Sequence, residues 1–170
     1  MPPLGAFMRR FILGFAAGLA TIPAVLLVSG LLGALPTRST VTPPAWETAF
    51  ARHALHAAAT VHAPHLQNPV APTDSTLRAG MKYFNDQCEG CHGSVKRDNS
   101  VGLYPPAPRF ATRPPTLPDW QLFWIVKNGV RYSGMFANDH VADEKIWTVV
   151  TFLRHLDSLP PSVAADWQAH

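Results

Sequence analysis

The chain has 170 residues, of which 47% are apolar and 15% are charged, with two cysteines and 17 prolines. This length leaves room for about one domain, and the composition excludes a disulfide scaffold and a charged disordered chain. The formal net charge of +3 comes from arginines beside an apolar N-terminal run, because residues 39–170 hold 11 Lys and Arg against 11 Asp and Glu. No basic stripe with interleaved aromatic residues remains, so we expect no nucleic-acid partner.

An uncharged run from Phe11 to Pro36 lies near the N-terminus. As a helix rising about 1.5 Å per residue it exceeds a hydrocarbon core of about 30 Å. A cleaved signal peptide is the alternative, but its apolar region is usually about 7–15 residues long and ends at a small-x-small site. Leu32-Gly33-Ala34-Leu35 places leucine where a small residue is wanted. We therefore expect residues 1–38 to be an uncleaved, single-pass transmembrane anchor.

The charges that flank this run predict its orientation. Arg9 and Arg10 precede the span and only Arg38 follows it, and basic residues collect on the cytoplasmic side of a membrane. The N-terminus is therefore expected inside and residues 39–170 outside. In a bacterium this means an inner-membrane protein with its domain in the periplasm.

Residues 39–72 are expected to form a linker and an extra periplasmic helix from Ala45 to His62. In that helix Trp46, Phe50 and either His53 or Ala54 recur at an amphipathic spacing. The helix could be an interaction element. Four histidines in this region suggest a metal site, but no cysteine or carboxylate cluster joins them and Pro64 breaks their register, so an ordinary structural role is favoured. They are His53, His56, His62 and His65.

Three more helices are expected in residues 73–160, which we assign to one all-α domain because no alternating strand pattern is present. The first begins at about Ser75, after the capping candidates Thr73 and Asp74, and runs toward Cys88. The second covers Asp119 to Asn128, and the third starts near Asp143 and is stopped by Pro160-Pro161. Residues 161–170 are expected to be a C-terminal tail.

The sequence Cys88-Glu89-Gly90-Cys91-His92 carries the chemistry. Cys-x-x-Cys-His is the attachment motif of c-type haem: the two thiols form thioethers to one haem and the histidine becomes an axial iron ligand. A thiol-disulfide redox pair is the alternative, but it requires a thioredoxin-like βαβ context. Zinc would require two further ligands of comparable quality. We therefore expect one covalently attached haem c on Cys88, Cys91 and His92.

Residues 73–160 resemble the monohaem class I cytochromes c, especially membrane-anchored bacterial members. The resemblance is carried by Gly80 and Phe84 ahead of Cys88, by Gly90-Cys91-His92-Gly93, and by Pro105-Pro106-Ala107-Pro108. It implies the class I cytochrome c fold around one haem, with Gly80 allowing close approach of the last helix. We expect Trp147 and Val150 to be the partners of Gly80 in that approach.

The resemblance also implies the remaining site residues. A backbone carbonyl of the proline-rich segment accepts the proximal histidine's Nδ1–H, with Pro106 and Pro108 as candidates and Pro108 preferred. The loop containing Gly134-Met135 resembles the family's methionine ligand loop, which makes Met135 the expected second iron ligand. Family members commonly have proline after this methionine, whereas this chain has Phe136. His140 and His155 are the alternative ligands.

These expectations together describe a membrane-tethered electron carrier rather than an enzyme, with membrane donor and acceptor complexes as partners and no small-molecule substrate. The chain could equally be the cytochrome subunit of a larger respiratory complex. A haem enzyme or gas sensor would require an open or labile sixth ligand position. Arg109, Arg113 and Trp120 are candidates for contacts with the haem propionates, with an ordinary solvated surface as the alternative.

Overall fold

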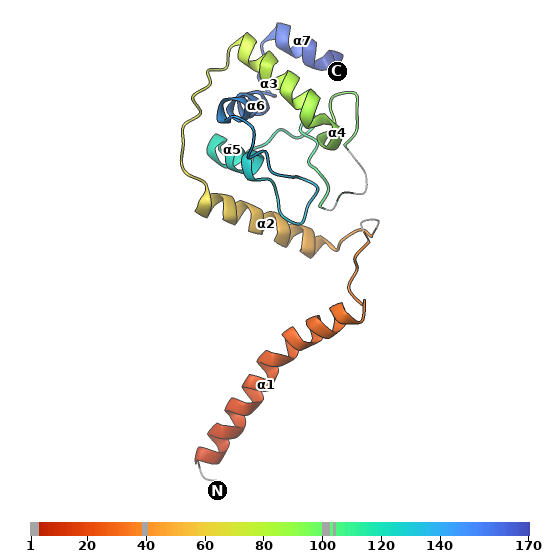
Figure 1. The fold of residues 1–170 in the computed structure, drawn as a ribbon, viewed down its shortest axis with the longest axis vertical. Helices are drawn as coiled ribbons and strands as arrows, with labels where there is room; N and C mark the ends of the chain where they lie inside the picture. The colour runs from red at the N-terminus through yellow and green to blue at the C-terminus, as the bar shows by residue number, and fades with distance from the viewer. Residues whose placement is uncertain (1–3, 39–40, 100–102, 104) are drawn as a thin grey trace. The chain divides into compact units, whose positions relative to one another are not determined.

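The computed structural model describes residues 4–38, 41–99, 103 and 105–170, and its regular elements in these residues are all α-helices. This confirms the expected all-α class. The helices are, in chain order, α1 (Leu4–Leu31), α2 (Ala45–His62), α3 (Asp74–Gln87), α4 (Glu89–His92), α5 (Asp119–Asn128), α6 (Asp143–Arg154) and α7 (Pro161–Ala169) (Figure 1). They fall into two units, Met1–Val41 and Thr42–His170, and each is described by itself.

The first unit contains α1, whose apolar stretch Met8–Leu31 is 24 residues long with a mean hydropathy of 2.3. Its large apolar side chains are exposed around the whole helix, and Pro23 lies inside the helix. Among the described residues it is the one helix long and apolar enough to cross a bilayer. A helix that is apolar all round requires an apolar environment, which suggests a single-pass membrane anchor.

The core of the second unit is built where α3 crosses α6. An added Cβ at Gly80 would lie 2.5 Å from Thr148 O and 2.6 Å from Phe152 Cβ, so only glycine permits this crossing. The close approach expected from the sequence is therefore present, but the expected partners, Trp147 and Val150, are wrong. Thr148 and Phe152 are four residues apart and share the face of α6 that meets α3.

Trp147 and Val150 lie on a different face of α6, the one that meets α5. There they form a second apolar cluster with residues of α5, and the Trp147 ring stacks on Phe123 with the ring centroids 4.1 Å apart. Helix α6 is buried on two faces as a result. This explains why the apolar stripe of α6 alone did not reveal which of its residues faces Gly80.

Helix α3 begins where the capping residues predicted it. Thr73 is the N-cap, its hydroxyl accepts from the Thr76 backbone N–H, and the Thr76 hydroxyl accepts from the Thr73 backbone N–H at 2.9 Å. This reciprocal pair satisfies two backbone donors that would otherwise lack partners. The start of the helix that leads into the cysteine motif is thereby fixed.

Residues 161–170 differ from the tail expected for them. Pro161 opens α7, a helix with Val163 completely buried and Trp167 4% exposed. Trp167 packs edge-on against Phe84 and Phe152, with ring centroids 5.8 Å and 5.2 Å away. The Pro160-Pro161 pair stops α6, but proline is also a favoured first residue of a helix, and Val163 and Trp167 have helical spacing.

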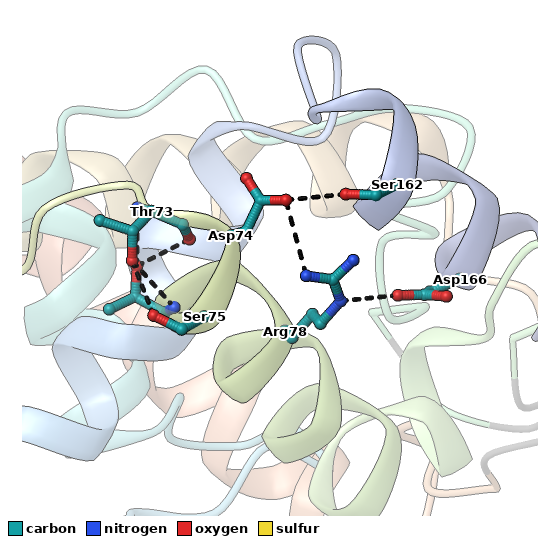
Figure 2. A network of polar contacts seen from close by, with 7 residues as sticks. Thr73, Asp74, Ser75, Arg78, Ser162 and Asp166 are labelled. Atoms are coloured by element: carbon teal, nitrogen blue, oxygen red, sulfur yellow. Dashed lines mark hydrogen bonds and ion pairs between the residues drawn. The ribbon is translucent and has the colours of Figure 1, made fainter.

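Polar contacts at the surface clamp α7 onto α3 (Figure 2). Arg78 Nε donates to Asp166 at 2.8 Å, and another nitrogen of the same guanidinium lies 3.5 Å from Asp74. The Ser162 hydroxyl donates to Asp74 at 2.7 Å. The hydrogen bond to the carboxylate of Asp166 raises the pKa of Arg78. The C-terminal helix is therefore an integral part of the second unit.

Helix α2 docks on α5 through its C-terminal half. Ala59 is completely buried, and Gln121 Nε2 donates to the Thr60 hydroxyl at 2.9 Å. The following segment continues the contact, because the His65 ring stacks on Trp120 with centroids 4.0 Å apart. The extra helix expected from the sequence is thus packed against the domain.

Candidate functional site

The cysteine motif lies at the junction of α3 and α4. The Cys88 backbone N–H donates to Phe84 O as α3 ends, and the His92 N–H donates to Cys88 O at 2.9 Å as the short α4 turns. One helical turn therefore gathers both thiols and the imidazole. Gly93 has a φ of 69°, and an added Cβ there would lie 2.5 Å from Arg97 O, so a glycine is required where the chain leaves the motif.

Two groups from the proline-rich segment hold the imidazole of His92. Its Nδ1 lies 2.8 Å from Pro108 O, which makes Pro108, of the two prolines considered, the one whose carbonyl accepts the hydrogen bond. The ring of Phe110 stacks on the imidazole with centroids 4.7 Å apart and planes 14° from parallel. A neutral imidazole with its proton on Nδ1 keeps a lone pair on Nε2, the form that binds iron.

Burial sets the protonation of the histidine and the first cysteine. It lowers the pKa of His92, against the opposing effect of the hydrogen bond to Pro108, and so favours the neutral ligand form. Burial also raises the pKa of Cys88 to about 11, with the nearby Cys91 adding to the effect. Both cysteines are free and half-buried. Redox-active cysteines have lowered pKa values, so this environment argues against the thiol-disulfide alternative.

Met135 lies half-buried in a loop that is closed by its own hydrogen bonds. The Val130 N–H donates to Met135 O at 2.8 Å, and the Ser133 hydroxyl accepts from the Met135 N–H at 3.1 Å. Gly129 opens the loop with a φ of 68°, and an added Cβ there would lie 2.6 Å from the carbonyl carbon of Phe136. These contacts order the loop although Phe136 replaces the proline common in the resembled family.

The two alternative ligands have other surroundings. The His140 side chain is exposed beside Asp139, with 3.5 Å between its Nδ1 and the carboxylate. His155 Nδ1 lies 2.8 Å from Thr151 O of its own helix.

Arg109 directly follows Pro108 and ties together the loop after the cysteine motif. Its guanidinium donates to Ser94 O at 3.1 Å and Val95 O at 3.2 Å and pairs with Asp98 at 2.6 Å. Among the described residues, its buried Nε has no hydrogen-bond partner. An orphaned, buried cationic donor beside the support of His92 fits an anionic group such as a haem propionate.

The other two propionate candidates differ from Arg109. Arg113 is exposed, and Trp120 stacks on His65. The described residues include no group of three or more His, Cys, Asp or Glu side chains that could hold a metal ion.

The residues of the motif fit a c-type haem. Two free thiols lie one helical turn apart and beside them is a half-buried, oriented imidazole. A thioether on an ordered loop and a buried guanidinium nitrogen without a partner complete the set. His92 and Met135 would hold the iron, Cys88 and Cys91 would hold the macrocycle, and Pro108 would orient His92.

Sequence reasoning missed Phe110 and Leu103 as parts of the site. Phe110 is distant from His92 in the chain, and its position two residues after Pro108 is the only local signal for the ring stacking. An added Cβ at Gly134 would lie 2.8 Å from Leu103 Cδ2, so the loop of Met135 packs against the segment after the motif. Contacts of this kind depend on how two loops meet in space.

Comparison with known proteins gives one family match. Residues 75–153 match the family described as cytochrome C oxidase, cbb3-type, subunit III. The matched segment runs from α3 through the cysteine motif and α5 to α6. No curated protein matches the chain.

Proposed function

Because residues 75–153 form a c-type cytochrome domain and the N-terminal apolar helix fits a membrane-anchored cytochrome c, we propose that the chain is a single-pass, membrane-tethered electron carrier with one haem. The observation that carries the proposal is the oriented imidazole of His92 within Cys88-x-x-Cys91-His92, held by Pro108 O at 2.8 Å. A bound haem c would supply the chemistry by taking up and releasing one electron at its iron.

The protein residues would set the properties of that iron. The hydrogen bond from Nδ1 to Pro108 O fixes the tautomer of His92 and makes Nε2 a stronger ligand. A thioether from Met135 as second ligand favours the reduced state and raises the potential. If His92 and Met135 both hold the iron, no position would remain for a substrate, which would favour electron transfer over enzyme chemistry.

The family match favours a second, related role. The matched description names a subunit of a cbb3-type cytochrome c oxidase, so the domain suits a subunit of a membrane respiratory complex. Both roles place the haem domain beside membrane partners that donate and accept electrons. The asymmetry of Arg9, Arg10 and Arg38 supports an inner-membrane location with the haem domain in the periplasm.

The test is covalent attachment and reversible reduction in the full chain, produced in a host with a c-type haem attachment system. Intact protein mass and in-gel haem staining should show one haem per chain that survives denaturation. Replacing both thiols (C88S/C91S) should abolish the stain, whereas the exposed control H140Q should retain it. An intact mass equal to that of the polypeptide alone would contradict the proposal.

A further inference from the structure

Helix α2 carries an exposed apolar stripe that is not used in the packing of the second unit. The residues of this outer stripe recur at intervals of three and four and so share one helical face. Trp46, Phe50 and Val61 are 72%, 69% and 74% exposed. The full set is Trp46, Phe50, Ala54, Ala57 and Val61, and every member is exposed.

The packed face of α2 lies on the other side of the helix. Ala59 is completely buried and follows Phe50 by nine residues, which at about 100° per residue places it about 180° away. Leu55, four residues before Ala59, is partly buried on the same side of the helix. Since α2 already meets α5 through this face, the outer stripe points away from the domain's core.

An exposed stripe with two large aromatic side chains requires an explanation, because contiguous apolar surface marks a binding site more often than a single exposed residue does. Tryptophan in particular is enriched where lipid headgroups meet the hydrocarbon, with its ring at headgroup level. Amphipathic helices that lie in this interface bury their apolar face by about 5–10 Å. The outer stripe has the composition of such a face.

The chain itself keeps this stripe near a membrane. Residues 32–44 join the end of α1 to the start of α2, and at 3.3–3.6 Å per extended residue they reach at most about 45 Å. A short tether gives an effective concentration of about a millimolar, so a weak affinity is enough to keep a tethered surface bound. A lipid surface is the partner that this tether always presents to α2.

We infer that α2 lies on the membrane surface with its outer stripe in the lipid interface, so that one face of the haem domain is held against the bilayer. This inference rests on the proposed anchoring by α1. Docking through α2 would restrict the rotation of the domain on its tether. The haem domain would then present a constant face to its membrane partners.

The test uses the full haem-loaded chain in vesicles of phosphatidylcholine and phosphatidylglycerol at low protein content. Two matched variants, A54C on the outer stripe and A49C off it, each replace an exposed alanine and lie about 140° apart on the helix. Each new thiol carries a bimane fluorophore, and quenching by doxyl-labelled phosphatidylcholine is measured against unlabelled vesicles. We expect at least about twofold stronger quenching at position 54, because an interfacial helix buries only its apolar face.

The variant W46S/F50S in the A54C chain should remove this excess and leave the visible spectrum unchanged, because both aromatic side chains are exposed. Equal quenching at positions 54 and 49 would overturn the inference. A fluorophore at position 54 that is shielded from water but not quenched by lipid, and that loses this shielding when the protein is diluted, would show that the stripe binds a second copy of the chain. This result would also overturn the inference. Flotation of the same vesicles tests the anchoring by α1 separately from the docking by α2. A chain that floats with the vesicles but shows equal quenching contradicts only the docking by α2. A chain that does not float contradicts the anchoring by α1.

Discussion

His92 is fixed by partners from a segment that follows it at a distance in the chain. Pro108 O orients one ring nitrogen, Phe110 covers the ring, and burial lowers the pKa of the imidazole. The second iron ligand proposed, Met135, depends instead on a short loop closed within itself. The two proposed ligands are therefore held by different hydrogen bonds, and their roles can be tested separately.

Met135→Ala should convert a closed haem site into one that binds an external ligand. Loss of the thioether opens an axial position, so we expect carbon monoxide to bind the reduced protein and the reduction potential to fall. Ligand binding is followed by absorption spectroscopy and the potential by redox titration.

Met81→Leu is the matched control, because Met81 is buried in the α3 core and a change of similar volume there costs less than about 1.5 kcal/mol. It should leave the spectrum and the potential unchanged. An M135A protein that does not bind carbon monoxide and has an unchanged reduction potential would exclude Met135 as the iron ligand.

How far each residue could be predicted depends on the kind of constraint acting on it. Cys88, Cys91 and His92 are recognisable because attachment to one haem requires a fixed local spacing. The carbonyl that accepts the hydrogen bond of His92 could be narrowed only to those of Pro106 and Pro108. Thr148 and Phe152 were missed as the partners of Gly80, since helical periodicity does not define which face of a doubly buried helix meets which neighbour.

At the scale of elements, helices α3, α6 and α7 form the main core of the second unit. Their boundaries follow local signals: the capping pair of Thr73 and Thr76, the acidic first turn of α6, and Pro161 at the start of α7. The sequence predicts a tail in place of α7, because a proline pair ends one helix as readily as it begins another. Its aromatic contacts and the Arg78 clamp could not be foreseen from a segment of this length.

Gly80→Ala should destabilise the domain by loosening the crossing of α3 and α6. The added Cβ would meet a backbone oxygen and a Cβ that cannot move aside easily. Overpacking costs about 1–3 kcal/mol, which outweighs the gain of at most about 1 kcal/mol in helix propensity. Thermal unfolding followed by circular dichroism should show a lower Tm.

Gly90→Ala provides the comparison, because an added Cβ there meets nothing within 4 Å. Its Tm should stay at the native value or rise slightly, because alanine has the higher helix propensity. If the two variants unfold at the same temperature, the close crossing at Gly80 is not important for stability.

Trp167→Ala tests whether α7 belongs to the core. Truncation of a buried tryptophan costs about 3–5 kcal/mol, and here it also removes the edge-on contacts with Phe84 and Phe152. Guanidinium denaturation should show this loss, while Gln168→Ala, on the exposed side of α7, should change stability little. A W167A protein as stable as the native chain would show that residues 161–170 do not contribute to the core.

At the scale of the whole molecule, an apolar helix and a helical domain are joined by a short linker. The apolar helix was predictable from length and hydropathy alone, because a bilayer imposes a minimum apolar length on any helix that crosses it. The exposure of Trp46 and Phe50 could not be predicted, because the amphipathic spacing of α2 does not indicate which partner its apolar face meets. That face is turned outward in the structure.

The orientation of the chain in its membrane can be tested with epitope tags at the two ends. The charge asymmetry around α1 predicts that, in bacterial spheroplasts, a C-terminal tag reacts with external antibody and an N-terminal tag reacts only after permeabilisation. The reverse pattern would place the haem domain in the cytoplasm and contradict the proposed location.

The most direct measurement of the central proposal is the absorption spectrum of the purified full chain, oxidised and reduced, with and without carbon monoxide. A c-type haem held by His92 and Met135 should show a sharp α band when reduced, a weak far-red band when oxidised, and no response to carbon monoxide. Rapid binding of carbon monoxide would show an open iron position and contradict an electron carrier with two protein ligands.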